Sequence, residues 1–214
     1  MSFINITFSI PHFYFYQMSV KTIVVGKTNC GKTCLINRII KDVYVESVAT
    51  INAVVITTDL KYNDQVAKIQ FNDIAGSEQY KNIVKSFFEN TNIALVVFSI
   101  DDRSSFDEID EWINSINEKV QTTNKNGPDY AALILVGAKS DKKNERAVSI
   151  EEAEEKAKSI GSPVDYVEVS SLSGEKIDKL RSMIVTQAID IIKVLPRHDG
   201  VSIHGTKSEK KCCW

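Results

Sequence analysis

The chain has 214 residues, which is enough for one well-buried domain with flanking tails and short for two. Its apolar and charged fractions are ordinary for a globular protein, and a net charge of −2 argues against a nucleic-acid partner, which would require a basic surface. The four cysteines lie near residue 30 and at the C-terminus, a distribution that suits a reducing compartment rather than a disulfide framework.

The first 17 residues are aromatic and apolar, which suggests a signal peptide at first sight. However, the segment has no positively charged start, is interrupted by Asn5, Thr7 and Pro11, and is too short and mixed to span a bilayer. Met18 opens a second stretch, "MSVKTIVVG", that is typical of the start of a folded domain. We therefore expect residues 1–17 to be an unstructured extension or a misassigned start, residues 18–194 to form the domain, and residues 195–214 to form a flexible tail.

Strand and helix patterns alternate from Val20 onward. Short continuous apolar runs predict strands buried on both faces, and apolar residues at helical spacing predict amphipathic helices. The pattern predicts strands at 20–26, 53–62, 65–71, 93–100, 131–138 and 165–170, with helices at 32–42, 149–160 and 176–193 and one long helix containing Phe106, Ile109, Trp112, Ile113 and Ile116. Asn63-Asp64 predicts a hairpin. The sequence thus indicates an α/β fold with a mostly parallel sheet, helices on both faces, and a site at the carboxyl edge of the strands.

The stretch "GKTNCGKT", Gly26 to Thr33, has the G-x-x-x-x-G-K-T spacing of a phosphate-binding loop and lies between a predicted strand and a predicted helix. Glycines let the backbone approach phosphates closely, and the loop N–H groups with the helix N-terminus favour an anion. Lys32 would reach the β- and γ-phosphates, and the Thr33 hydroxyl would ligate Mg²⁺. The alternative is a glycine-rich turn without this role. The loop itself is common to ATPases, kinases and GTPases.

Four further stretches, "TIN" at 50–52, "DIAGSE" at 73–78, "VGAKSD" at 136–141 and "SSL" at 170–172, occur in the order and spacing of a Ras-like small GTPase. "VFSIDDRSSFDEIDEWINSI", the "YVES" stretch beginning at Tyr44 and the terminal "CC" resemble the Rab branch of that family. The resemblance covers about Val20 to Lys193 plus the tail. It implies the P-loop GTPase fold with a six-stranded sheet, and GTP or GDP with Mg²⁺ as ligands.

The resemblance also implies individual roles. Thr50 would meet Mg²⁺ and the γ-phosphate, Asp73 would hold Mg²⁺ through water, the Gly76 N–H would contact the γ-phosphate, and Tyr44 would lie against the base. Asp141 would accept hydrogen bonds from N1–H and the 2-amino group of guanine, whereas adenine has an acceptor at N1 and no 2-amino group. The full set of implied nucleotide contacts is Gly26, Thr28, Asn29, Cys30, Gly31, Lys32, Thr33, Cys34, Tyr44, Thr50, Gly76, Lys139, Asp141, Ser170, Ser171 and Leu172, with Thr33, Thr50 and Asp73 at the metal.

The sequence departs from the family pattern at positions that affect hydrolysis and guanine binding. Ser77 replaces the glutamine that orients the attacking water beside Gly76 and Lys32, and Thr28 fills a position where small residues are common; both predict slow hydrolysis. Ala138 replaces the asparagine that contacts guanine N7 and braces the phosphate loop, and Leu172 replaces a lysine, so we expect weakened but still selective guanine binding.

Two further departures lie on the surface that effectors of this family read. Val55 and Asn72 occupy positions where phenylalanine and tryptophan are usual, which predicts an unusual choice of partner.

The chain ends in "KSEKKCCW". The adjacent cysteines could be a chance pair or half a metal site, but no further His or Cys lies near them. A farnesylation box would require a cysteine at position 211, which is Lys211. Double geranylgeranylation at Cys212 and Cys213, as in the Rab branch, fits a flexible tail, and two lipid chains give stable membrane attachment.

Three functions follow from these observations. The leading hypothesis is a monomeric Rab-like GTPase that acts as a switch in vesicle trafficking, on the cytoplasmic face of intracellular membranes with a cytosolic pool. Its partners would be an exchange factor, a GTPase-activating protein, effectors and the prenylation machinery. The rival is a catalytically idle, nucleotide-bound tether or effector-binding module on membranes. A P-loop kinase or ATPase is disfavoured by Asp141.

Overall fold

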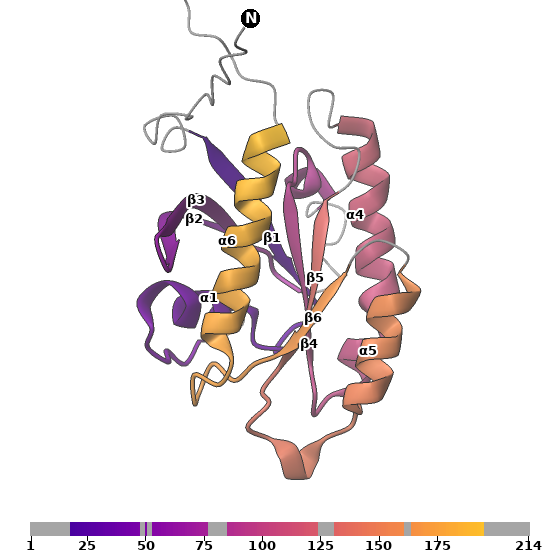
Figure 1. The fold of residues 1–214 in the computed structure, drawn as a ribbon. Coiled ribbons are helices and arrows are strands. Elements are labelled where there is room, and N and C mark those ends of the chain that lie inside the picture. The colour runs from indigo at the N-terminus through magenta and orange to yellow at the C-terminus, as the bar shows by residue number, and fades with distance from the viewer. Residues whose placement is uncertain are drawn as a thin grey trace, which may run out of the picture.

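The computed structural model describes residues 18–47, 50, 53–76, 85–123, 131–160 and 164–194. These residues form a six-stranded sheet in the order β2-β3-β1-β4-β5-β6 (Figure 1). Only the β2–β3 pair is antiparallel; the other neighbours run parallel. The strands are β1 (Ser19–Val25), β2 (Val54–Tyr62), β3 (Gln65–Asp73), β4 (Ile93–Ser99), β5 (Ala132–Ala138) and β6 (Asp165–Glu168). The predicted α/β fold with a mostly parallel six-stranded sheet is confirmed.

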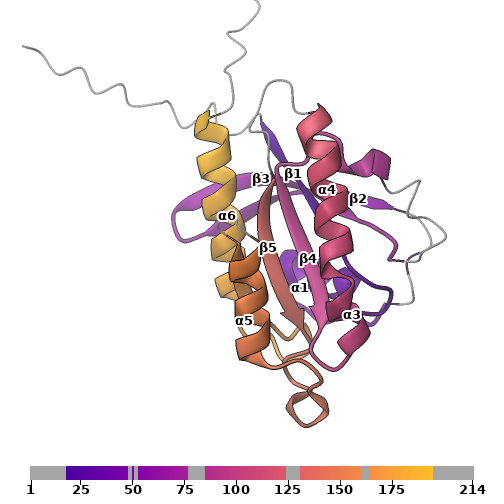
Figure 2. The same ribbon diagram turned by 90° about the vertical axis from the view of Figure 1, so that its right-hand side faces the viewer.

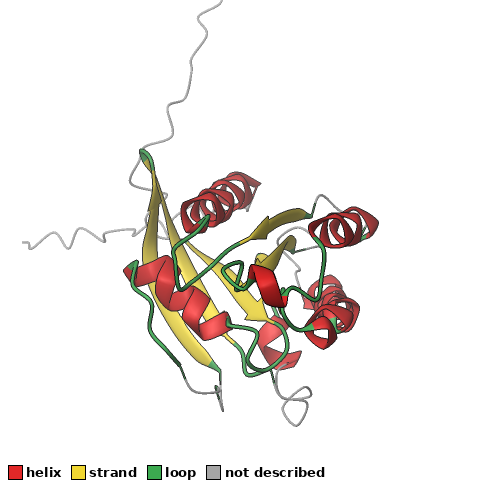
Figure 3. Ribbon diagram, turned by 90° about the horizontal axis from the view of Figure 1, so that it is seen from below, coloured by secondary structure: helices red, strands yellow, loops and turns green. Residues whose placement is uncertain are grey.

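Helices cover both faces of this sheet, as Figures 2 and 3 show from two further directions. The helices are α1 (Lys32–Lys41), α3 (Arg103–Asp107), α4 (Ile109–Thr123), α5 (Ile150–Ser159) and α6 (Ile177–Val194), with short 3-10 turns η3 (Lys85–Phe88) and η4 (Lys143–Glu145). One apolar core joins α1 and α6 to the sheet, and a second joins α3, α4 and α5 to the opposite face. All seven residues of β4 are buried because both of its faces are covered.

Local sequence accounts for how the elements begin and end. The predicted hairpin at Asn63-Asp64 is confirmed, and Asn63 has the left-handed backbone (φ 52°) that asparagine tolerates in tight turns. Ser149 caps α5 as predicted by accepting a hydrogen bond from the Glu152 N–H at 3.1 Å.

The prediction of one long helix around Trp112 is wrong in one respect. The segment forms two helices, α3 and α4, separated at Glu108. Glu108 keeps a right-handed backbone (φ −79°, ψ −6°) but its N–H bonds back to Phe106 O, which interrupts the regular α ladder. The apolar face continues across the break, since Phe106 and Ile109 are both buried in the same core.

Some predicted features lie outside the described residues. They include the extension at 1–17, Ile51 and Asn52 of the "TIN" stretch, Ser77 and Glu78, Gly161 and the tail with Cys212 and Cys213. Within the described residues, no helix combines the length and apolar character needed to cross a bilayer.

A partly buried ion pair joins the loop after β5 to β6. Arg146 Nη1 and Nη2 donate to Glu168 Oε1 and Oε2, both at 2.7 Å, and the Tyr166 hydroxyl donates to Glu168 Oε1 at 2.8 Å. Burial acts to raise the pKa of Glu168, but the hydrogen bonds from Arg146 and Tyr166 outweigh it and leave the pKa below its usual range. The carboxylate is therefore held ionised beside Gly137, where a Cβ would lie 3.1 Å from Glu168 Cγ.

We expect Glu168→Gln to lower the free energy of unfolding at neutral pH by about 3 kcal/mol, the lower end for a broken buried ion pair, because Arg146 keeps some access to water. The Glu168 pKa is depressed in the folded state, so its contribution is present above the unfolded pKa and is lost as pH falls through the folded pKa. Urea unfolding at pH 7 and in buffer below the unfolded pKa of glutamate, about 4.3, tests both points. The variant should lose less stability on acidification than the wild type, and the exposed Glu155→Gln serves as the matched control.

Candidate functional site

The loop from Gly26 to Thr33 joins β1 to α1 and has an unusual backbone. Gly26 (φ 142°), Asn29 (φ 65°) and Gly31 (φ 102°) all have positive φ. A Cβ on Gly26 would lie 2.0 Å from Val97 O, so no other residue fits beside β4. Gly31 is the N-cap of α1 and supplies no side-chain hydrogen bond, which leaves the first N–H groups of the helix available to a ligand.

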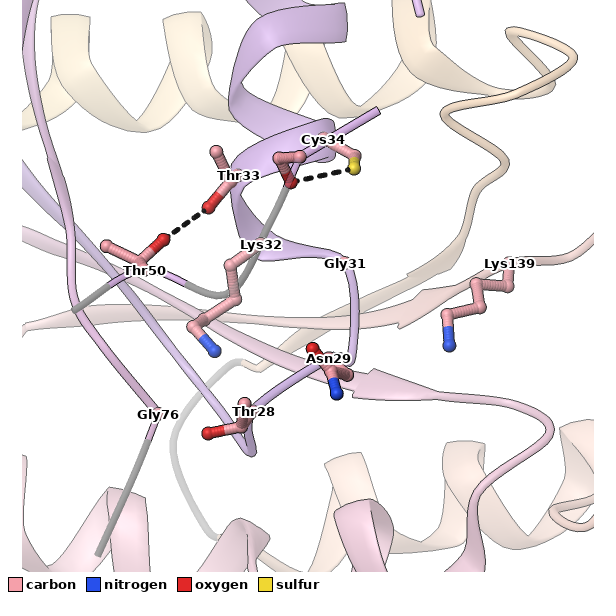
Figure 4. Close-up of a pocket in the computed structure, with 10 residues that line it drawn as sticks. Thr28, Asn29, Gly31, Lys32, Thr33, Cys34, Thr50, Gly76 and Lys139 are labelled. Atoms are coloured by element: carbon pink, nitrogen blue, oxygen red, sulfur yellow. Dashed lines mark hydrogen bonds between the residues drawn. The ribbon is translucent and has the colours of Figure 1, made fainter. Parts of the chain in front are cut away.

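Lys32 places a buried ammonium inside this loop. The residue is 6% exposed, and its Nζ donates to Gly26 O and Lys27 O, both at 2.8 Å. Figure 4 shows the side chain of Lys32 extending under the loop between Thr28 and Thr33. Among the described residues its hydrogen-bond partners are neutral, so this cation is favourably placed to bind an anion, such as a phosphate, at the mouth of the loop.

Thr33, Thr50 and Asp73 come together from three parts of the chain. Thr33 Oγ1 lies 2.9 Å from Thr50 Oγ1 (Figure 4) and donates to Asp73 Oδ2 at 2.5 Å. Asp73 Oδ1 is buried and has no hydrogen-bond partner within the described part of the chain. Burial raises the pKa of Asp73 above its usual range, against the opposing effects of Thr33 and Lys32.

This oxygen set fits Mg²⁺. Magnesium favours oxygen ligands, is commonly held by one or two protein groups plus phosphate oxygens and water, and would satisfy the orphaned Asp73 oxygen. Among the described residues, no group of three or more His, Cys, Asp or Glu side chains could hold a metal on its own. The site would therefore hold the ion together with the phosphates of a ligand.

A pocket of about 140 Å³ collects many of the predicted residues. It is lined by Thr28, Asn29, Gly31, Lys32, Thr33, Cys34, Ser47, Thr50, Gly76 and Lys139. Gly76 lies directly against the loop, because a Cβ there would be 2.3 Å from Gly26 O. The side chain of Cys30 is instead part of the apolar core, and Cys30 is not among the residues that line this pocket.

Ser47 was missed by sequence reasoning; its hydroxyl lies 3.2 Å from Cys34 Sγ. The only available signal was its position between Tyr44 and Thr50.

Two further loops lie beside this pocket at the ends of β5 and β6. Asp141 Oδ1 accepts a hydrogen bond from Ser170 Oγ at 2.5 Å, and Ser140 N donates to Val169 O at 3.0 Å. Lys139 has a left-handed backbone (φ 63°) that opens the turn carrying Asp141. The two loops therefore fix one carboxylate at the edge of the sheet.

Tyr44 and the residues after Ser170 complete the surroundings of these loops. Tyr44 is 42% exposed, and slight desolvation, followed by the charges of Cys34, Glu46 and Asp141, raises its pKa above the usual range. Leu172 is exposed, and neither Ser171 nor Leu172 lines the pocket.

Position 138 faces the phosphate loop, as the sequence predicted. Ala138 is buried at the end of β5, and its Cβ lies 3.8 Å from the point where a Cβ of Gly31 would be. The alanine methyl group offers no hydrogen bond to the loop. Ala138, the substitution expected to weaken guanine-nucleotide binding, therefore lies next to Gly31 of the phosphate loop.

The two positions expected on the effector surface differ in exposure. Val55 and Asn72 are opposite each other in the β2–β3 ladder. Val55 is 52% exposed, but Asn72 is only 2% exposed and donates to Gln70 O at 3.2 Å. Val55 therefore presents its side chain at the surface, whereas the amide of Asn72 is directed to its own strand; the unusual choice of partner stays a prediction.

Comparison with known proteins identifies the class to which this fold and site belong. The sequence model of the Ras family matches residues 21–190, and the chain belongs to that family. It is 31% identical to Ras-related protein Rab-11B of Dictyostelium discoideum over 164 residues, covering 76% of this chain and 70% of that protein.

Other similar proteins are also Rab-related. The chain is 27% identical to Ras-related protein SEC4 of Saccharomyces cerevisiae over 211 residues, covering 92% of this chain and 93% of SEC4. It is 29% identical to bovine Ras-related protein Rab-26 over 171 residues, which cover 77% of this chain and only 61% of Rab-26. The chain is thus a Rab-like small GTPase of the Ras family, and the family implies binding of guanine nucleotide and Mg²⁺.

Replacing the methyl group at position 138 with an amide should strengthen guanine-nucleotide binding. We expect Ala138→Asn to lower the Kd for GDP by about threefold to tenfold, since a neutral hydrogen bond contributes about 0.5–1.5 kcal/mol. Ala138→Val adds similar volume without a hydrogen bond and should not reproduce the gain. Equal affinities of wild type and Ala138→Asn in a GDP titration would contradict this interpretation.

Proposed function

We propose that this protein binds GTP and GDP with Mg²⁺ and acts as a slow molecular switch. The observation that carries the proposal is the convergence of Lys32, the Thr33–Asp73 pair and Thr50 on one pocket, with Asp141 fixed beside it. Lys32 would bind the phosphates, and Thr33, Thr50 and Asp73 would hold the ion. When bound, Mg²⁺ neutralises charge on the phosphate oxygens.

Asp141 would select guanine over adenine. Its carboxylate accepts hydrogen bonds only, which suits the N1–H and 2-amino donors of guanine and opposes the N1 acceptor of adenine. Ser170 donates to Oδ1 and so restricts the rotation of the side chain. Tyr44 would cover the base, as the resemblance to the Rab branch implies.

Slow hydrolysis would follow from the residues near the γ-phosphate position. Ser77 is too short to orient a water molecule from the backbone position normally held by glutamine. Thr28 adds a β-branched side chain to the pocket lining. In GTPases an arginine supplied by an activating partner accelerates hydrolysis by roughly 10³–10⁵-fold, so the GTP-bound state would be long-lived without such a partner.

A role in vesicle trafficking is supported by the Rab-related proteins to which the chain is similar. Bound GTP would order the segments around Thr50 and residues 73–80, creating a surface for effectors that hydrolysis removes. Lipid chains on Cys212 and Cys213, with Lys207, Lys210 and Lys211 attracted to anionic lipid, would hold the protein on the cytoplasmic face of intracellular membranes, with a cytosolic pool.

A second function is favoured by the substitutions at Ser77, Ala138 and Leu172. In this alternative the protein holds nucleotide permanently and serves as a membrane tether or effector-binding module. The two functions differ in one measurement, because the tether would release no phosphate over hours even with an activating partner present.

The nucleotide preference tests the central proposal. We expect GDP and GTP to bind, in the presence of Mg²⁺, at least about a hundredfold more tightly than ADP and ATP, because two hydrogen bonds to a carboxylate are at stake. Calorimetric titration of the full chain measures this ratio. Lys32→Ala should abolish binding of both guanine nucleotides, whereas the exposed Lys179→Ala on α6 should not. A wild-type protein that binds neither GDP nor GTP would overturn the proposed function.

Restoring the missing amide at position 77 tests the origin of slow hydrolysis. Ser77→Gln should raise single-turnover GTP hydrolysis by at least about tenfold, because glutamine can position the attacking water. Ser159→Gln makes the same change on the surface of α5 and should leave the rate unchanged. An unchanged rate in Ser77→Gln would show that serine is not the cause.

A further inference from the structure

Two consecutive carboxylates follow β4, and each holds a lysine from a different loop of the nucleotide site. Asp101 contacts the loop after β5 that carries Asp141, and Asp102 contacts the phosphate loop. We refer to Asp101 and Asp102 as the acidic pair. Their backbone is fixed by the end of β4, where Ile100 N donates to Ala138 O at 3.1 Å and Asp102 N donates to Ser99 O at 3.0 Å.

Asp101 holds both ends of the turn that contains Asp141. Its Oδ2 lies 2.7 Å from Lys142 Nζ, and its Oδ1 lies 3.6 Å from Lys139 Nζ. Lys142 N donates to Lys139 O at 2.9 Å and closes the turn between them. The Asp101 carboxylate thus contacts Lys139 and Lys142, which lie on either side of Asp141, the side chain proposed to bind guanine.

The Asp101 carboxylate is well suited to this role. Its side chain is only 11% exposed, and the Ser99 hydroxyl also donates to it. Burial acts to raise the pKa of Asp101, but hydrogen bonds from Lys142 and Ser99 and the nearby Lys139 charge lower it to about 2. The carboxylate therefore stays charged throughout the neutral range, and both lysines keep their partner.

Asp102 acts in the same way on the phosphate side. Its Oδ2 lies 3.5 Å from Lys27 Nζ, and Lys27 also donates to the Ser104 hydroxyl. Asp102 is the N-cap of α3 and accepts from Ser104 N at 3.0 Å, so its carboxylate is held in place by the helix start. Since Lys27 directly follows Gly26, this contact ties the phosphate loop to α3.

The methyl group of Ala138 cannot hydrogen-bond to the phosphate loop beside Gly31, so the contacts of the acidic pair are a separate means of holding the loops of the site. We propose that the acidic pair consists of positioning residues for the nucleotide: Asp101 orients the Lys139–Lys142 turn and with it Asp141, and Asp102 steadies the phosphate loop through Lys27. The proposal rests on the proposed function, since it concerns the same nucleotide site. It assigns the two halves of the ligand, base and phosphates, to two different carboxylates.

A comparison of GDP with inosine diphosphate (IDP) separates an effect on base binding from an effect on phosphate binding. Inosine lacks the 2-amino group, so IDP makes one hydrogen bond to Asp141 where GDP makes two. A displaced Asp141 therefore weakens GDP more than IDP, whereas a loosened phosphate loop weakens both alike. The ratio of the two dissociation rates reports the base side alone.

The experiment measures release of fluorescent GDP and IDP from the full chain with Mg²⁺, in Asp101→Asn, Asp102→Asn and the wild type. Asp101→Asn should release GDP about fivefold faster and reduce the preference for GDP over IDP by a similar factor, as two partly exposed ion pairs are lost. Asp102→Asn should accelerate both ligands by about threefold and leave the preference unchanged. Asp190→Asn, which removes the same charge from an exposed ion pair on α6, should change neither.

The preference itself distinguishes positioning from general loss of stability, because a destabilised fold would release GDP and IDP faster alike. Adding Ala138→Asn to Asp101→Asn should slow the release of both ligands alike, since both bases carry N7, and should leave the lowered GDP preference unchanged. Should Asp101→Asn fail to fold, Lys142→Gln removes one of its two lysine contacts at a half-exposed position and should reduce the GDP preference by about twofold.

Three results would overturn the inference. A wild-type GDP preference in Asp101→Asn would remove the role of Asp101, and so would an unchanged preference in Lys142→Gln. Wild-type release rates in Asp102→Asn would remove the role of Asp102. In each of these cases wild-type binding of GDP leaves the proposed function intact, whereas a wild type that binds neither ligand overturns the proposed function itself.

Discussion

The site depends on a single buried positive charge held by backbone oxygen atoms. Lys32 is almost inaccessible, and within the described part of the chain its ammonium donates to the carbonyls of Gly26 and Lys27 and, more distantly, to the Cys30 sulfur. A buried cation without a negative partner is costly, so the loop is stabilised by any ligand that supplies negative charge at its mouth. The positive φ angles of Gly26 and Gly31 shape the phosphate loop around the Lys32 ammonium. Gly76 lies directly against Gly26, so the loop also contacts the segment that follows β3.

Sequence reasoning was strongest where the structure is locally determined. The phosphate loop, the Asn63-Asp64 hairpin and the Ser149 cap all depend on residues within a few positions of one another, so spacing alone indicates them. The continuous apolar runs of β4 and β5 likewise predict strands covered on both faces. The interruption at Glu108 was not predictable from periodicity, because the apolar face runs on through both helices.

Contacts between distant parts of the chain account for what the sequence could not indicate. The lysine partners of Asp101 lie about forty positions away, and no local pattern distinguishes this carboxylate from an ordinary surface acid. Asn72, which lies at a position expected on the effector surface, is buried, and its amide donates to Gln70 O within its own strand. The orientations of Cys30 and Cys34 also required the fold, since one belongs to the core and the other to the pocket.

The position of β2 has a consequence for the behaviour of the protein in solution. β2 is the outermost strand and pairs only with β3 within the described part of the chain, so its other edge carries backbone groups free to pair with another strand. The charged side chains of Asp59 and Lys61 in the second half of β2 discourage such pairing. Val54 and Val55 at the start of β2 are exposed and uncharged. Self-association of concentrated protein should therefore begin at the first residues of β2, and a partner that covers them would improve solubility as well as gain an apolar contact.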